Sequence, residues 1–132
     1  MRAHIHRVAC VGAGLIGQDW ATLFSSKGFE VVLQDLSETV LEKSMRSIRS
    51  NLLFLEANNV LKQGEAEAAL GRIEMTPFLD QAVSRADYVQ ESVPDDYDLK
   101  KRVFREMDAT APDHALLASS SSGLLMTEIQ KV

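Results

Sequence analysis

The stretch that decides the fold runs from residue 7 to residue 35 and reads RVACVGAGLIGQDWATLFSSKGFEVVLQD. Residues 7–11 show the short apolar pattern of a buried strand, and residues 29–33 show a second one. Between them lie a glycine-rich turn and a stretch with apolar residues at helical spacing, which Gly28 closes as a C-cap. This order predicts two parallel neighbouring strands joined by a right-handed crossover through one helix.

The rest of the chain continues to alternate strands and helices. Ser37 is a good N-cap for a helix that carries a narrow apolar seam and reaches residue 58 or 59, and a short helix follows at 65–70. Further strands are predicted at 72–76, 86–91 and 115–118, with helices at 77–83 and 95–108. We therefore predict an α/β fold: a Rossmann-type, doubly wound parallel sheet with a helical-hairpin insertion after the second strand.

The composition is that of one ordinary globular domain. The chain has 132 residues, of which 45% are apolar and 25% are charged. Its formal net charge of −5 argues against a nucleic-acid partner. No apolar run approaches the roughly 18 residues of a membrane span, and the first residues lack the apolar stretch of a signal peptide. We expect a cytoplasmic protein that binds neither nucleic acid nor membrane.

Residues 12–17 form a candidate phosphate-binding turn of the pattern G-x-G-x-x-G. The pattern follows a predicted strand, opens a predicted helix, and precedes a strand that ends in an acid. Gly12 would allow the tight turn, Gly14 would let a pyrophosphate approach the backbone, and Gly17 would let the helix pack on the strand. The N–H groups at the helix start, around Leu15 and Ile16, would face the diphosphate. The alternative is a glycine-rich turn without a ligand.

Asp35, at the end of the second strand, is the candidate contact for an adenosine ribose. Its carboxylate would accept hydrogen bonds from the ribose hydroxyls and would repel a 2′-phosphate. Leu36 and Ser37 offer no cation that could neutralise such a phosphate. We therefore expect NAD rather than NADP, while a strand-end Asp that only caps the next helix is the alternative.

Three other features support no separate chemistry. Cys10 lies among apolar neighbours, with nothing nearby in sequence to lower its pKa, so it is interpreted as packing. His4 and His6 alternate near the start without a third ligand, so no metal site is predicted. The serine run at residues 119–122 lacks the G-x-S-x-G pattern of a nucleophile elbow and a partnered His, which disfavours a serine hydrolase.

Taken together, these features resemble the NAD-binding domain of the 3-hydroxyacyl-CoA dehydrogenase family. The resemblance rests on the glycine turn, Asp35, the helical insertion, the segment ESVPDDYDLKK at residues 91–101, and ASSSSGL at residues 118–124. It covers nearly the whole chain from Arg7 onward. The serine-rich segment and Trp20 are most similar to the branch that contains L-gulonate 3-dehydrogenase and lambda-crystallin.

The resemblance implies further site residues. Asp95 and Lys100 occupy the positions of an acid and a lysine that contact the dinucleotide, although the commoner acid is glutamate. Ser122 matches the serine that hydrogen-bonds the substrate oxygen near the nicotinamide, and it could also cap a following helix. Asn51 and Asn58 stand where family members that bind CoA have a Ser and a Lys, which weakens the case for a CoA substrate.

The resemblance also implies the reaction and the assembly. In the family, hydride passes from a 3-hydroxy acid or 3-hydroxyacyl-CoA to NAD+, and a His–Glu pair about twenty residues after the serine segment takes the proton. The chain stops at Val132. We therefore expect residues 1–132 to be the NAD-binding domain, without the family's helical C-terminal domain and inactive alone, while the full-length protein acts in fatty acid metabolism as a homodimer. The alternatives are a protein similar to L-gulonate 3-dehydrogenase or lambda-crystallin that acts on a 3-hydroxy acid without CoA, and a non-catalytic NAD-binding module.

Overall fold

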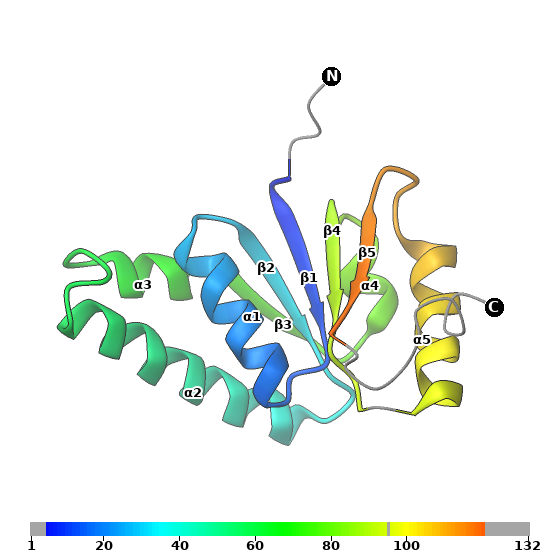
Figure 1. The fold of residues 1–132 in the computed structure, drawn as a ribbon, viewed down its shortest axis with the longest axis horizontal. Helices are drawn as coiled ribbons and strands as arrows, with labels where there is room; N and C mark the ends of the chain where they lie inside the picture. Colours follow the sequence, from blue (N-terminus) through cyan, green and yellow to red (C-terminus); the bar gives the residue numbers. More distant parts are fainter. Residues whose placement is uncertain (1–4, 95, 121–132) are drawn as a thin grey trace.

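A computed structural model describes residues 5–94 and 96–120 of the chain. Strands and helices alternate through these residues, as the sequence predicts (Figure 1). In chain order the elements are β1 (Arg7–Val11), α1 (Leu15–Ser26), β2 (Glu30–Gln34), α2 (Glu38–Ala57), α3 (Glu65–Leu70), β3 (Ile73–Thr76), α4 (Leu79–Val83), β4 (Tyr88–Glu91), α5 (Tyr97–Thr110) and β5 (Leu116–Ser119).

The described strands form one parallel sheet in the order β3-β2-β1-β4-β5. The chain moves outward from β1 to β2 and β3, and then crosses back to place β4 on the other side of β1. The strand order therefore reverses between β1 and β4. Open α/β sheets bind ligands outside the carboxyl ends of the strands at such a reversal. The predicted doubly wound parallel sheet is confirmed, and it locates the candidate site.

Two apolar cores lie on the two faces of the sheet. One joins α1, α2 and α3 to β1 and β2 through residues such as Val31, Leu33 and Ile48. The other joins α4 and α5 to the opposite face through residues such as Val89 and Phe104. Alternate residues of each central strand point into the two cores, which explains why β1 is a nearly continuous apolar run.

The helix ends follow local chemistry that the sequence displays. The Ser37 hydroxyl accepts a hydrogen bond from the N–H of Val40 and starts α2. Gly28 has φ +97° just after α1, a left-handed conformation that suits glycine and ends the helix. The predicted helical hairpin is confirmed as α2 and α3, which pack on each other.

The start of α5 differs by two residues from its prediction at residue 95. Asp96 is the N-cap, because its carboxylate accepts a hydrogen bond from the N–H of Leu99 at 3.0 Å. The helix itself therefore begins at Tyr97. A capping acid with extended backbone lies outside the helix that it starts, and this accounts for the difference.

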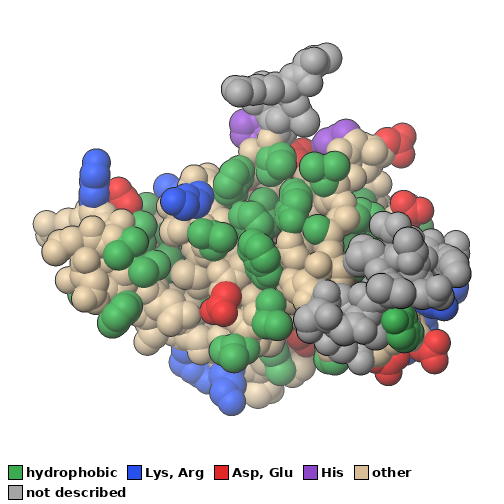
Figure 2. All heavy atoms as spheres, viewed as in Figure 1, with side chains coloured by type: hydrophobic (Ala, Val, Ile, Leu, Met, Phe, Trp, Pro, Cys, Tyr) green, Lys and Arg blue, Asp and Glu red, His purple; other side chains and the backbone are tan. Residues whose placement is uncertain are grey.

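The face of the sheet that carries α1 is only partly covered by the described helices. Figure 2 shows hydrophobic side chains gathered near the middle of this face. Phe24 packs against Trp20 and Tyr88, with ring centroids 5.5 and 5.7 Å away, and Leu116 on β5 is 55% exposed. Among the described residues, no helix is long and apolar enough to cross a membrane.

Candidate cofactor-binding site

The glycine turn joins the end of β1 to the start of α1 in a narrow space. Gly12 has φ +97°, and a Cβ there would lie 2.8 Å from the backbone of Ser92 after β4. A Cβ at Gly17 would lie only 1.9 Å from the carbonyl oxygen of Gly12. At Gly14, by contrast, a Cβ would meet no heavy atom within 4 Å. Two glycines are therefore required for packing, and the third leaves an open approach to the backbone.

The start of α1 presents its backbone to this open side. Gly14 is the N-cap, no described side chain caps it, and the first turn carries no acidic residue. Leu15 and Ile16, the first two helical residues, are 76% and 53% exposed. The first N–H groups of a helix have no partner within the helix, and the helix dipole adds partial positive charge there. This arrangement fits the diphosphate of a dinucleotide.

Asp35 follows β2 directly beside the glycine turn. One oxygen of its carboxylate accepts a hydrogen bond from the N–H of Ala13 at 3.0 Å, and the other accepts from the N–H of Ser37 at 3.1 Å. The side chain is half-buried. Each carboxylate oxygen has two lone pairs, so each can accept one more donor, such as a ribose hydroxyl. Asp35 thus fixes the turn and the start of α2, and it retains capacity for a sugar.

A cleft of about 550 Å³ opens beside Asp35. It lies among the ends of β1 and β2, the segment before α4, the segment after β4, and α5. Leu36 and Phe78 on its rim are 85% and 57% exposed. A mostly apolar cleft with a few polar groups is typical of a small-molecule site, and this one is large enough for an adenine ring. Its lining includes Leu36, Phe78, Val93, Pro94, Leu99 and Val103.

A buried ion pair holds the segment between β4 and α5. The Nζ of Lys100 lies 2.7 Å from Oε2 of Glu91, and the two side chains are 1% and 0% exposed. Lys100 also donates to the carbonyl oxygen of Val93 at 2.9 Å. Glu91 accepts from the N–H of Val93 and from the hydroxyl of Ser119, both at 2.5 Å. This cluster joins β4, β5 and α5 next to the glycine turn.

The structure brings some predicted site residues together and leaves others undescribed. Gly12, Gly14, Gly17 and Asp35 lie around one opening, and Lys100 lies behind it in the ion pair with Glu91. Asp95 and Ser122, for which the resemblance implies roles at the dinucleotide and at the substrate, lie outside the described residues.

Two titratable side chains away from the opening have shifted pKa values. Cys10 is fully buried, and desolvation raises the pKa of its thiol to about 12, which confirms its interpretation as packing. At the other end of β4, Asp87 has a pKa lowered to about 2. The causes are, in order, hydrogen bonds from the N–H of Arg7, from His114 and from the N–H of His6. The described residues contain no cluster of three or more His, Cys, Asp or Glu that could hold a metal ion.

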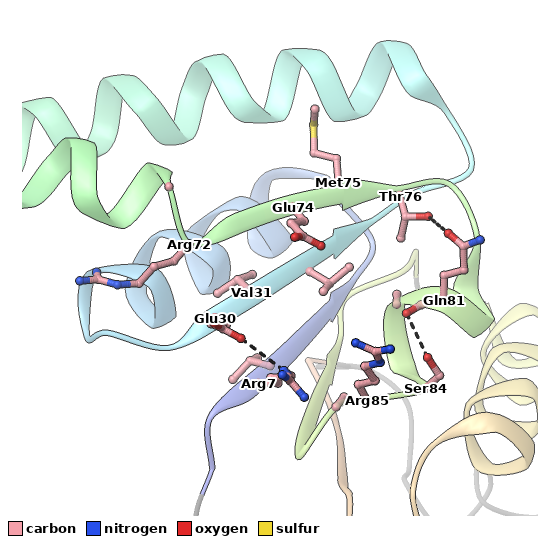
Figure 3. A pocket seen from close by; sticks show the side chains of 15 residues that line it. Arg7, Glu30, Val31, Arg72, Glu74, Met75, Thr76, Gln81, Ser84 and Arg85 are labelled. Atoms are coloured by element: carbon pink, nitrogen blue, oxygen red, sulfur yellow. Dashed lines mark hydrogen bonds and ion pairs between the residues drawn. The ribbon is translucent and has the colours of Figure 1, made fainter.

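A second cavity, of about 540 Å³, lies on the face of the sheet that carries α4 (Figure 3). It exists because α4 spans only five residues and leaves the neighbouring part of the sheet uncovered. Arg7 and Glu30 form an exposed ion pair of 3.2 Å at its edge. Its lining on β1 and β2 comes from the starts of these strands, far from their carboxyl ends. It is therefore distinct from the opening at the glycine turn.

Comparison with known families decides which group of proteins this site belongs to. The model of the 3-hydroxyacyl-CoA dehydrogenase NAD-binding domain matches residues 7–132. The chain belongs to this family. NAD is the cofactor of the family's domain, and the open Gly14, the helix start and Asp35 all fit it.

Relatives in sequence include both crystallins and enzymes. The chain is 43% identical over 124 residues to the lambda-crystallin homolog of Bos taurus, and the matched region covers 92% of this chain and 38% of the relative. It is 38% identical over 128 residues to the L-carnitine dehydrogenase of Streptomyces coelicolor, covering 96% of this chain and 39% of the relative. The chain thus spans about two fifths of the length of these relatives.

Solved structures of the family share the fold. The 3-hydroxybutyryl-CoA dehydrogenase of Escherichia coli superposes with a TM-score of 0.90 at 26% identity, covering 96% of this chain and 26% of that one. The (S)-3-hydroxybutyryl-CoA dehydrogenase of Ralstonia eutropha gives a TM-score of 0.88 at 28% identity, covering 96% of this chain and 44% of that one.

The sequence alone does not predict the buried polar groups that lie behind the opening on the β4 side. Gln90 and Glu91 end β4, and they are 3% and 0% exposed. Gln90 bonds to Ser120, and Glu91 bonds to Lys100 and Ser119. Only one feature of the sequence indicates these groups, namely two polar residues in a row at the end of a predicted buried strand. Buried polar groups need hydrogen-bond partners, so such a pair indicates a polar cluster in the interior.

Proposed function

We propose that the chain is the cofactor-binding part of an oxidoreductase that transfers hydride between NAD and a small 3-hydroxy acid. The observation that carries the proposal is the opening at the carboxyl ends of β1 and β2. There an uncapped helix start, an open glycine and the Asp35 carboxylate lie side by side next to an apolar cleft. Gly14, Leu15, Ile16 and Asp35 would contact the dinucleotide, and Gly12 and Gly17 would shape the turn that binds it.

In this arrangement the chain's own residues bind and orient the cofactor. The N–H groups at the start of α1 would hold the diphosphate, and Asp35 would accept hydrogen bonds from the adenosine ribose. The ion pair between Glu91 and Lys100 would hold the segment after β4 in place, with Asp95 and Lys100 proposed near the dinucleotide. Bound NAD+ supplies the hydride acceptor, so that the 3-hydroxy substrate becomes a 3-keto product. Ser122 is proposed to hydrogen-bond the substrate oxygen.

A substrate without CoA is favoured over an acyl-CoA. Asn51 and Asn58, at the positions of the family's CoA-binding Ser and Lys, are exposed on α2 and at its C-cap. The amide of Asn58 donates to the carbonyl oxygen of Phe54 at 2.8 Å, and it supplies no cation for a CoA phosphate. L-carnitine, the substrate that the name of one relative gives, is a 3-hydroxy acid without CoA. An acyl-CoA substrate would instead place the reaction in fatty acid metabolism.

The activity of the whole protein is tested with the product of the complete gene. We expect NAD reduction with L-carnitine or L-gulonate to exceed that with 3-hydroxybutyryl-CoA, and we expect the 132-residue chain alone to show no turnover. Turnover with the acyl-CoA alone would overturn the substrate preference. NAD binding without turnover of any 3-hydroxy acid would favour the non-catalytic module, which the similarity to the lambda-crystallin homolog supports. We propose a homodimer for the complete protein from its membership of the 3-hydroxyacyl-CoA dehydrogenase family, and we propose the cytoplasm as its location.

The cofactor site itself is tested by filling its open side. Gly14→Val adds a side chain whose Cβ would meet no heavy atom within 4 Å, so the fold should persist while NAD binding is lost. Gly71→Ala, at the end of α3 and far from the opening, is the matched control, because a Cβ there has its nearest neighbour at 3.4 Å. NAD binding by Gly14→Val equal to that of the control would refute the proposed site.

A further inference from the structure

The hydroxyl of Ser120, just after β5, lies at the centre of a polar cluster. Its oxygen is 2.7 Å from Nε2 of Gln90, 3.0 Å from Nε1 of Trp20, and 3.0 Å from the hydroxyl oxygen of Ser92. Gln90 is itself fixed, because its Oε1 accepts a hydrogen bond from the hydroxyl of Tyr88 at 2.7 Å. Three side chains, from α1, β4 and the segment after β4, therefore converge on the Ser120 oxygen. A fourth, Tyr88, bonds to the amide of Gln90.

The donors and lone pairs in this cluster determine which of the two serine hydroxyls donates to the other. The indole of Trp20 can only donate, and the Nε2 of Gln90 donates as well. These two bonds occupy both lone pairs of the Ser120 oxygen. The single hydrogen of Ser120 must then be donated to the oxygen of Ser92. Ser92 accepts there, and no described residue accepts the hydrogen of Ser92 in return.

Ser92 lies where the strand order of the sheet reverses. It follows β4, and its backbone is the group that a Cβ at Gly12 would strike at 2.8 Å. Asp35 lies on the other side of β1, at the end of β2. A dinucleotide with its adenosine ribose at Asp35 and its diphosphate at the start of α1 would extend toward β4. Its nicotinamide half would thus reach the side of the sheet where Ser92 lies.

We propose that the Ser92 hydroxyl donates a hydrogen bond to an oxygen of the nicotinamide–ribose half of NAD. The Ser120 hydroxyl orients this donor by occupying its acceptor side, while Gln90 and Trp20 orient Ser120. The proposal rests on the proposed function, because it needs the dinucleotide to cross the glycine turn. It adds a specific donor for the half of the cofactor that carries the reaction.

The test compares the binding of NAD+, ADP-ribose and AMP. ADP-ribose keeps the adenosine, the diphosphate and the second ribose but lacks nicotinamide. AMP lacks the whole nicotinamide–ribose half. Calorimetric titration of the Ser92→Ala chain should show NAD+ binding weakened about fivefold, the loss expected for one neutral hydrogen bond. AMP binding should stay within twofold of the wild type, roughly the spread of such measurements. A loss with ADP-ribose assigns the acceptor to the ribose, and a loss with NAD+ alone assigns it to the carboxamide; either supports the proposal.

Two further variants separate this role from a general effect on the fold. Ser50→Ala, on the exposed surface of α2, is the matched control and should bind all three ligands as the wild type does. Ser120→Ala should weaken NAD+ binding by less than Ser92→Ala, because it leaves the donor in place but unoriented. The double variant should then match Ser92→Ala alone, since Ser120 acts through Ser92.

Two results distinguish a failure of the role proposed for Ser92 from a failure of the proposed function. If Ser92→Ala leaves NAD+ binding unchanged, or weakens AMP binding equally, the role of Ser92 is refuted while the cofactor site stands. If the wild-type chain binds neither NAD+ nor AMP, the proposed function itself is refuted.

Discussion

Replacing Lys100 with methionine should destabilise the chain strongly, because the change leaves a buried carboxylate without its cation. The Nζ of Lys100 lies 2.7 Å from Glu91, and both side chains are at most 1% exposed. Glu91 would keep the N–H of Val93 and the hydroxyl of Ser119 as partners. Removing one member of a buried ion pair costs about 3–5 kcal/mol, a large part of the ~5–15 kcal/mol by which a domain is stable.

The loss is measured by urea unfolding followed by circular dichroism. With a slope of about 2 kcal/mol/M, a loss of about 4 kcal/mol lowers the midpoint by about 2 M. Arg49→Met is the control, because Arg49 and Glu67 form an ion pair of 3.1 Å whose side chains are 59% and 64% exposed. Exposed pairs contribute about 0–1 kcal/mol, so this variant should shift the midpoint by less than about 0.5 M.

A matched double variant tests the reason for the loss. Glu91→Gln combined with Lys100→Met removes both charges, and it should recover most of the stability that Lys100→Met alone loses. A Lys100→Met midpoint within error of the Arg49→Met midpoint would show that the buried ion pair does not stabilise the fold. A double variant that is less stable than Lys100→Met would show that the loss does not come from the unpaired carboxylate.

Three other predictions concern the glycine turn, the buried thiol and the acid at the far end of β4. Gly17→Ala should lower both the melting temperature and NAD binding, because its Cβ would lie 1.9 Å from the Gly12 oxygen; an unchanged melting temperature would contradict this. Cys10, whose pKa is raised to about 12, should not react with Ellman's reagent near pH 8 until urea unfolds the chain, and fast reaction of the folded chain would contradict its burial. Asp87, with a pKa lowered from 3.8 to about 2, contributes stability above about pH 4 that is lost as the pH falls toward 2. Asp87→Asn should therefore lose less stability than the wild type between about pH 5 and pH 3, and equal losses in urea unfolding would contradict the assignment.

The sheet could be predicted because its signals are local. The glycine turn, the cap at Ser37 and the apolar strands each act within a few neighbouring residues, and the crossover rule makes the first two strands parallel neighbours. The position of Asp35 beside the turn follows from the same short stretch. The NAD-binding family could also be inferred, because its motifs keep fixed spacings along the chain.

The polar interior behind the site could not be predicted in the same way. Lys100 lies in a run of basic residues that is typical of a solvent-exposed helix face, yet it is buried against Glu91, nine residues earlier on another element. Ser120 meets Trp20 across a hundred positions of sequence. Such pairings depend on how helices and strands pack in three dimensions, and no periodic pattern along the chain encodes them.

Calorimetric titration of the 132-residue chain with NAD+ and with NADP+ tests the proposed cofactor site most directly. We expect NAD+ to bind at least tenfold more tightly, because the Asp35 carboxylate accepts from the ribose hydroxyls and repels a 2′-phosphate, a difference of about 1.4 kcal/mol or more. Equal or tighter binding of NADP+, or no binding of NAD+, would contradict this expectation.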